Sequence, residues 1–201
     1  MSIMAPKSLT QVLSVIALVP LLAVPPAFGA PKPKRDEPTK PELVAAFGDW
    51  TVFRVKRGKG HDCYAHAVPK VRAPEAVKRD PSDAFVTTRP GEKVRNEPSF
   101  TMGFDVATAE PEKEAKGAKK RAQGSGPSAQ IGPESFEMQP KGTNLWVKNV
   151  AEESRFIDEM KKGIELKVSA ASKKGNVMTD AYSLKGFAPA IERLQKECPA
   201  G

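Results

Sequence analysis

The chain has 201 residues, which is enough for one domain or two small ones. Charged residues make up 28% and hydrophobic residues 39% of it, close to the values of ordinary globular proteins, so the composition argues against full disorder. The 15 glycines and 19 prolines favour turns and extended segments, which excludes a coiled coil and a multi-pass membrane protein. The sequence therefore predicts one folded domain with a loose tail or a large loop.

Residues 1–29 have the three parts of a secretory signal peptide. Lys7 precedes a mostly apolar stretch over residues 9–24, and small residues up to Gly29 follow. A membrane span needs about 20 uninterrupted apolar residues, and Pro20 interrupts this stretch. We therefore expect cleavage after Gly29 and no transmembrane span in the mature chain. We also expect export to the periplasm or cell surface of a Gram-negative bacterium.

The net charge of +8 falls to +7 when Lys7 leaves with the signal peptide. For an exported protein, the available polyanions are lipid headgroups and surface polysaccharides rather than nucleic acid. We therefore expect the partner to be a protein or an anionic envelope or host surface. This charge allows peripheral membrane contact, and no nucleic-acid partner is expected.

The rest of the chain divides into a linker, a domain and an insertion. Residues 30–45 are predicted to form a Pro- and Lys-rich linker, and residues 46–201 are predicted to form the domain. Within the domain, residues 105–130 are rich in charge, glycine and serine and offer no side chain that could anchor a core, which predicts a flexible basic insertion. The insertion is either a solvated loop or a mobile tether for an anionic surface, with its cations at Lys119, Lys120 and Arg121.

The pattern of the domain predicts a mainly β fold, an antiparallel β-sandwich with two short helices. Turn residues separate short β-rich runs, and an apolar stripe at helical spacing occurs twice. Asn149 and Glu152 have the spacing of a capping box before the first helix, and Gly163 ends it. In chain order, we expect strands over 50–55, 62–68, 84–88, 94–104, 135–138 and 144–147, a helix around 156–160, strands over 164–170 and 177–184, and a last helix over 187–198.

The two cysteines, Cys63 and Cys198, are predicted to form a disulfide, because an oxidising compartment favours a pair. Cys198 continues the apolar stripe of the last helix and so faces the core. Such a bridge stabilises the domain, and the inward-facing thiol of Cys198 suits a reactive, exposed nucleophile badly.

An alternative is a periplasmic metal-binding or thiol-redox protein that uses His61, Cys63 and His66. The strand period argues against one shared ion, because His61 and Cys63 lie on one face of a strand and His66 lies on the other. A disulfide would also remove Cys63 from the ligand set. We therefore expect no metal and no cofactor.

Few other residues suggest chemistry. Arg89, Lys93 and Arg95 surround the Pro90-Gly91 turn and could bind an anion or a partner, although a charged hairpin tip is the simpler interpretation. No nucleophile elbow, phosphate loop or dinucleotide fingerprint occurs in the sequence. We therefore predict a protein that is not an enzyme and has no catalytic residues. Trp50 and Trp146 are expected in the core.

Five groups of short segments occur in a recognisable order before the terminal cysteine. They are FGDW at 47–50, CYA at 63–65, TTRP at 87–90 with VRNE at 94–97, MKKG at 160–163 and TDAYSLKGF at 179–187. In this order they resemble the invasion-associated locus B family of exported alphaproteobacterial proteins. The resemblance covers about residues 46–198, with the stretch 105–130 as an extra insertion.

The resemblance implies an immunoglobulin-like β-sandwich, exported to the periplasm or cell surface, with no catalytic residues to carry over. It also implies an interaction module that contributes to host-cell association or envelope integrity. Longer members of the family have a second cysteine pair, which this chain lacks. Phe53 and Arg54 stand near the position where the first cysteine of that pair would be expected.

Overall fold

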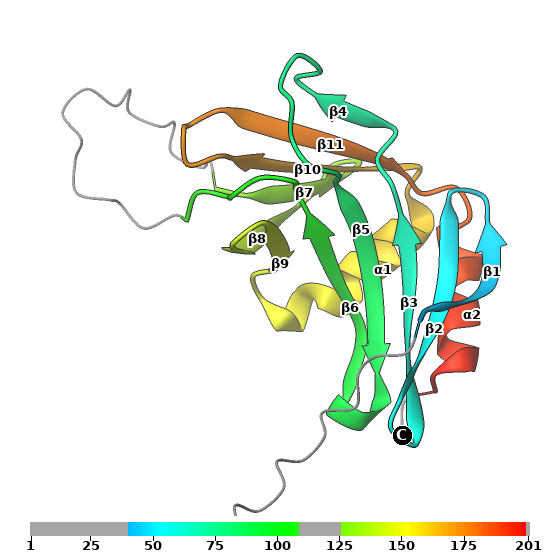
Figure 1. Ribbon diagram of the computed structural model, residues 1–201. Coiled ribbons are helices and arrows are strands. Elements are labelled where there is room, and N and C mark those ends of the chain that lie inside the picture. Colours follow the sequence, from blue (N-terminus) through cyan, green and yellow to red (C-terminus); the bar gives the residue numbers. More distant parts are fainter. Residues whose placement is uncertain (1–39, 109–125, 200–201) are drawn as a thin grey trace, which may run out of the picture. The chain divides into compact units, whose positions relative to one another are not determined.

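The structure is a computed structural model and describes residues 40–108 and 126–199. These residues form a mainly β domain with two short α-helices (Figure 1). The strands are β1 Glu42–Phe47, β2 Trp50–Arg57, β3 Gly60–Ala67, β4 Val71–Ala73, β5 Asp83–Arg89, β6 Val94–Thr101, β7 Ser128–Ile131, β8 Glu134–Lys141, β9 Asn144–Val147, β10 Glu165–Ala171 and β11 Val177–Ser183. The helices are α1 Glu153–Lys162 and α2 Phe187–Glu197, and the 3-10 turns are η1 Pro90–Glu92 and η2 Val150–Glu152.

The strands form one open antiparallel sheet in the order β1-β2-β3-β5-β6-β9-β8-β7-β10-β11-β4. Strand β8 joins the two parts of this sheet, since its first half pairs with β7 and its second half, from Met138 to Lys141, pairs with β9. A strand that changes partners in this way makes a corner between two packed layers. The arrangement is sandwich-like and confirms the predicted mainly β fold with two short helices.

Both helices pack on the inner side of the sheet, where the apolar residues of alternate strand positions form one core. Helix α1 contacts β6, while α2 contacts β1, β2 and β3 (Figure 1). Their buried side chains follow the predicted helical stripes: Phe156, Ile157 and Met160 in α1, and Phe187, Ala190, Ile191 and Leu194 in α2. Among the described residues, no helix lies over the opposite side of β2, β3, β5 and β6.

Two of the segments that carry the family resemblance contact each other in the core. The amide of Asp49 donates to the carbonyl of Lys185 at 3.0 Å, and the indole of Trp50 donates to the carbonyl of Ser183 at 3.0 Å. The ring of Trp50 meets that of Phe187 edge to face, with 4.8 Å between the ring centres. The segments FGDW and TDAYSLKGF thus join the start of the sheet to β11 and α2.

Two predicted boundaries were wrong. The predicted linker 30–45 ends too late, because β1 begins at Glu42 and pairs with β2. The insertion 105–130 is also too long at both ends, since Val106 is buried and bridges to Ser172, and β7 over 128–131 pairs with β8 and β10. The remaining insertion residues, 109–125, lie outside the described residues, as do the predicted signal peptide and most of the linker.

Three local predictions also needed correction. Residues 69–82, which lie between two predicted strands and in which no strand was expected, contain the short strand β4. Ile164 was placed in the alternation of the next strand, but it is 89% exposed and β10 begins at Glu165. The side chain of Asn149 accepts a hydrogen bond from the amide of Ala151, so it caps the turn η2 rather than α1 itself. Among the described residues, no helix is long and apolar enough to cross a membrane.

Candidate functional site

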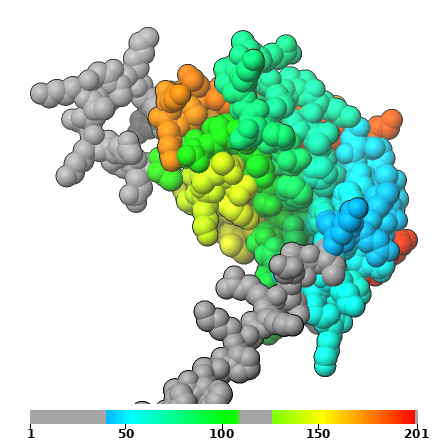
Figure 2. All heavy atoms as spheres, viewed as in Figure 1, coloured from blue at the N-terminus to red at the C-terminus, as the bar shows by residue number. Residues whose placement is uncertain are grey.

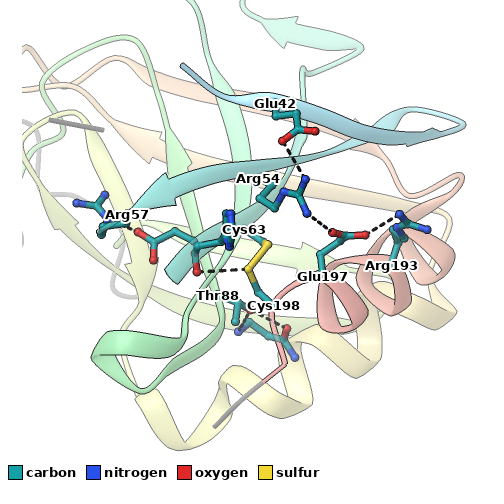
Figure 3. Close-up of a disulfide and its surroundings, with 11 residues drawn as sticks. Glu42, Arg54, Arg57, Cys63, Thr88, Arg193, Glu197 and Cys198 are labelled. Carbon is teal, nitrogen blue, oxygen red and sulfur yellow. Dashed lines mark hydrogen bonds and ion pairs between the residues drawn. A yellow bond between two sulfur atoms is a disulfide. The ribbon is translucent and has the colours of Figure 1, made fainter. Parts of the chain in front are cut away.

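The disulfide lies at one end of the sheet, where the end of α2 meets β3 (Figure 3). Cys63 and Cys198 are bonded, with their Cα atoms 5.9 Å apart, and both residues are buried. Cys63 also pairs across β3 and β5 with Thr88, which is itself buried. The predicted bridge is confirmed, and its surroundings make it part of the core.

A chain of charges runs beside the disulfide and joins three elements (Figure 3). Arg54 of β2 contacts Glu42 of β1 at 2.9 Å and Glu197 of α2 at 3.2 Å. Glu197 also pairs with Arg193 on the same helix at 2.6 Å. The hydrogen bond that Arg54 donates to the carboxylate of Glu42 raises the pKa of Arg54, because it favours the charged guanidinium. These contacts tie the first strand to the last helix beside the disulfide.

The two histidines do not converge with Cys63 on one ion. His66 lies on the outer side of β3, where its Nε2 is 2.8 Å from a carboxylate oxygen of Asp83, while Cys63 points into the core. His61 is exposed near the start of the strand. Within residues 40–108 and 126–199, no group of three or more His, Cys, Asp and Glu is arranged to hold a metal ion. Nothing in the geometry favours the metal or redox alternative over the disulfide.

The three cations predicted around the Pro90-Gly91 turn differ in their surroundings. Arg89 contacts Glu92 at 2.7 Å and Glu97 at 3.1 Å, and these carboxylates raise its pKa although burial acts against the charge. Lys93, with φ of 58°, and Arg95 are exposed. Arg89 therefore holds the hairpin together, and Lys93 and Arg95 remain available to a partner. Lys119, Lys120 and Arg121 lie outside the described residues.

The outer side of the sheet carries an aromatic quartet that the sequence analysis did not identify: Phe53 of β2, Tyr64 and His66 of β3, and Phe85 of β5. Each ring contacts two others, with ring centres 5.2 Å apart for Phe53–Tyr64, 5.9 Å for Tyr64–Phe85, 5.0 Å for Phe85–His66 and 6.4 Å for His66–Phe53. All four side chains are half-buried although no helix in the described part of the chain lies over them. The cyan and green strands that bear them form the front of the space-filling view (Figure 2).

Further apolar side chains extend this quartet along the same face, which we call the open face. Leu43 of β1 is the cross-strand neighbour of Phe53 and is 61% exposed. Beyond Phe85, toward β9, Ser99 of β6 is the cross-strand neighbour of both Phe85 and Trp146. Trp146 was expected in the core with Trp50, but it is half-buried on this outer face because its neighbour Leu145 takes the inward position.

The charged groups on the open face are paired with one another. Asp83 contacts His66 in the quartet, and Glu97 at its margin is held by Arg89. Burial raises the pKa of Tyr64, so its hydroxyl stays protonated well above neutral pH. The remaining positions between the rings, Thr51, Thr87 and Ser99, are uncharged. The open face is therefore aromatic at its centre and almost neutral.

Fold and site together define a disulfide-closed, mainly β domain with an uncovered aromatic face. Comparisons with protein-family models, with curated proteins and with solved structures gave no match.

Proposed function

We propose that this protein is a non-enzymatic, exported interaction module that binds a protein of the cell envelope or of a host surface through its open face. The observation that carries the proposal is the aromatic quartet, which stays half-exposed on a sheet face that no helix of residues 40–108 and 126–199 covers. Soluble proteins rarely leave contiguous apolar side chains on one face unless a partner covers them. Aromatic residues with few free charges are typical of the centre of a protein interface.

The geometry of the rings favours a protein partner over a stacked planar ligand. Phe53 and Tyr64 stack against each other at an interplanar angle of 22°, so these two rings cover each other's faces. They turn edges rather than open faces to a ligand, and ring edges and methyl groups pack well against the apolar side chains of a second protein. Since the charges of this face are already paired, we expect the surface of the partner that contacts it to be uncharged and apolar, with polar groups at its margin.

The signal-peptide pattern of residues 1–29 and the Cys63–Cys198 bridge support export, because disulfides persist in oxidising compartments. The family proposal, an invasion-associated locus B protein that serves envelope integrity or host-cell association, rests on the ordered segments of the sequence. It is supported by the contact of Trp50 with Phe187 and Ser183, since two of these segments build one part of the fold.

Photocrosslinking in the native envelope tests the binding face. A photoreactive phenylalanine analogue at Tyr64 or Phe85 should give an adduct of discrete mass with one protein, and the same analogue at the exposed helix positions Ser154 and Glu192 should not. With the probe at Phe85, the substitution Phe53→Ser should lower the adduct yield by about tenfold, as expected for a central interface residue. Equal adducts from the sheet and helix positions, or none from either, would overturn the proposal.

The export part is tested by the intact mass of the protein from its native envelope, with and without reduction, in the presence of an alkylating reagent. A chain that begins near Ala30 and takes up two alkyl groups only after reduction supports export together with the Cys63–Cys198 bridge. Uptake of two groups without reduction contradicts it and brings His61, Cys63 and His66 back as a candidate set.

A further inference from the structure

Two hairpin tips lie side by side at the disulfide end of the sheet. One is the turn between β2 and β3, and the other contains η1 between β5 and β6. They are neighbours because β3 pairs antiparallel with β5, which places Cys63 opposite Thr88 near the start of one strand and the end of the other. A groove of about 500 Å³ lies between the tips and is lined by residues from both, including Gly60 and Gly91. Figure 1 shows both tips at the same end.

The tips carry more positive than negative charge, and the acids among them are already paired. Asp62 contacts Arg57, while Glu92 and Glu97 both contact Arg89. The exposed cations Lys59, Lys93 and Arg95 are not matched by any of these acids. Among the described residues, no ion pair or side-chain hydrogen bond reaches these three side chains. We call Lys59, Lys93 and Arg95 the basic tip surface.

We infer that the basic tip surface docks the protein on a membrane that contains anionic phospholipids, with the lipid phosphates as ligands. The inference is independent of the open face and goes beyond the proposed function. Lys59 and Lys93 are exposed in the two turns, and Arg95 is exposed at the start of β6, so all three lie at the end of the sheet where one anionic layer can meet both tips (Figure 1). A small soluble anion in the groove would meet Asp62, Glu92 and Glu197, which also line it, and these carboxylates would repel it.

The expected size of the effect follows from the charge of the layer. Each Lys or Arg near an anionic membrane surface strengthens binding by about fivefold, and three such cations by about a hundredfold. Because this attraction is electrostatic and acts near the surface, salt screens it over a Debye length of about 10 Å at moderate ionic strength. Raising the salt concentration should therefore remove the preference for anionic vesicles.

The test is flotation of the full chain with phosphatidylcholine vesicles that do or do not contain phosphatidylglycerol. The measured quantity is the affinity for vesicles with phosphatidylglycerol divided by the affinity for vesicles without it. Binding through the apolar residues 9–24 that does not depend on headgroup charge cancels in this ratio. The triple variant Lys59→Gln, Lys93→Gln and Arg95→Gln should lower this ratio by about a hundredfold.

The matched control removes the same charge at positions away from the tips, as Lys78→Gln, Lys141→Gln and Lys174→Gln. Lys78 follows β4, Lys141 is the last residue of β8, and Lys174 lies in the turn between β10 and β11. This control should keep most of the ratio, and circular dichroism should show both triple variants folded. An equal loss in both variants, or no loss in the tip variant, would overturn the inference. Binding of soluble dextran sulfate through the same three cations, without a preference for anionic vesicles, would also overturn it.

Discussion

Arg79 and Asp180 form a buried ion pair between the loop that follows β4 and the middle of β11. Asp180 is fully buried, and the side chain of Arg79 is 3% exposed. The Nη1 of Arg79 lies 2.8 Å from one carboxylate oxygen of Asp180, and it also donates to the carbonyl of Met102 at 2.7 Å. The pair therefore fixes the loop against both the end of β6 and β11.

Removing one member of this pair should destabilise the domain strongly. Arg79→Met leaves the carboxylate of Asp180 buried, with Arg72 at 3.9 Å as its one remaining ion-pair partner among the described residues, and should cost about 3–5 kcal/mol of the free energy of unfolding. The double variant Arg79→Met with Asp180→Leu removes both charges and should recover most of this loss. Urea unfolding of the wild type, the two single variants and the double variant measures the coupling. A loss below about 1 kcal/mol for Arg79→Met would contradict the pairing.

The disulfide should contribute a large share of the stability. It joins residues 135 positions apart, and on the chain-entropy model a loop of this length is worth about 5 kcal/mol, with measured values commonly lower. The double variant Cys63→Ala and Cys198→Ala should lose about 2–5 kcal/mol in urea unfolding. The reduced wild type should unfold at nearly the same denaturant concentration as this variant. If the variant were as stable as the oxidised wild type, the prediction would be wrong, and the apolar contacts of α2 alone would hold this helix against the sheet.

The sequence predicted most of the sheet because the buried strands alternate. Leu166, Val168 and Ala170 of β10 are buried while Glu165 and Lys167 are exposed, which is the expected period of two. Strand β1 lacks this signal, since it is an edge strand with no fully buried residue and its start lies among prolines and charges. Strand β7 was missed because it has four residues, and its two buried side chains are the small Ala129 and Ile131 at its very end.

The open face and the Arg79–Asp180 pair could not be predicted from the pattern, because both depend on contacts between distant residues. In β2, aromatic and apolar residues occur on both faces, so the pattern does not tell which face the helices cover. Phe53 joins Tyr64 and Phe85 only through the strand register. Charged residues are expected at the surface, so neither Arg79 nor Asp180 signals burial by itself. The opposite faces of Cys63 and His66, in contrast, followed directly from the strand period and are confirmed.

Gly186 should be intolerant of any side chain. Its φ of 87° lies in the left-handed region, and a Cβ there would overlap the carbonyl of Phe47. Gly186→Ala should therefore cost at least about 2 kcal/mol of the free energy of unfolding, because both backbone strain and the contact with the FGDW segment oppose it. Gly91→Ala is the control, since its φ is not positive and nothing lies within 4 Å of an added Cβ. That variant should change the stability by less than about 0.5 kcal/mol in the same urea experiment.

The two tyrosines should ionise in separate steps at alkaline pH. Burial raises the pKa of both above the ordinary value of 10.0, and for Tyr182 the carboxylates of Asp180 and Asp83 raise it further. In the unfolded chain, Tyr182 ionises near pH 10. Since its folded pKa is raised, the stability linked to Tyr182 is fully present below about pH 10 and is lost as the pH rises above that value.

Tyr64→Phe isolates the buried residue, because Tyr64 and Tyr182 are the two tyrosines of the chain. In this variant, tyrosinate absorbance should appear only together with the loss of far-ultraviolet circular dichroism, since Tyr182 is fully buried. Tyr182→Phe should resist alkaline unfolding better and be no less stable at neutral pH, because the hydroxyl has no hydrogen-bond partner among the described residues. Tyrosinate formation in folded Tyr64→Phe would show instead that water or hydroxide reaches the Tyr182 hydroxyl in the native state.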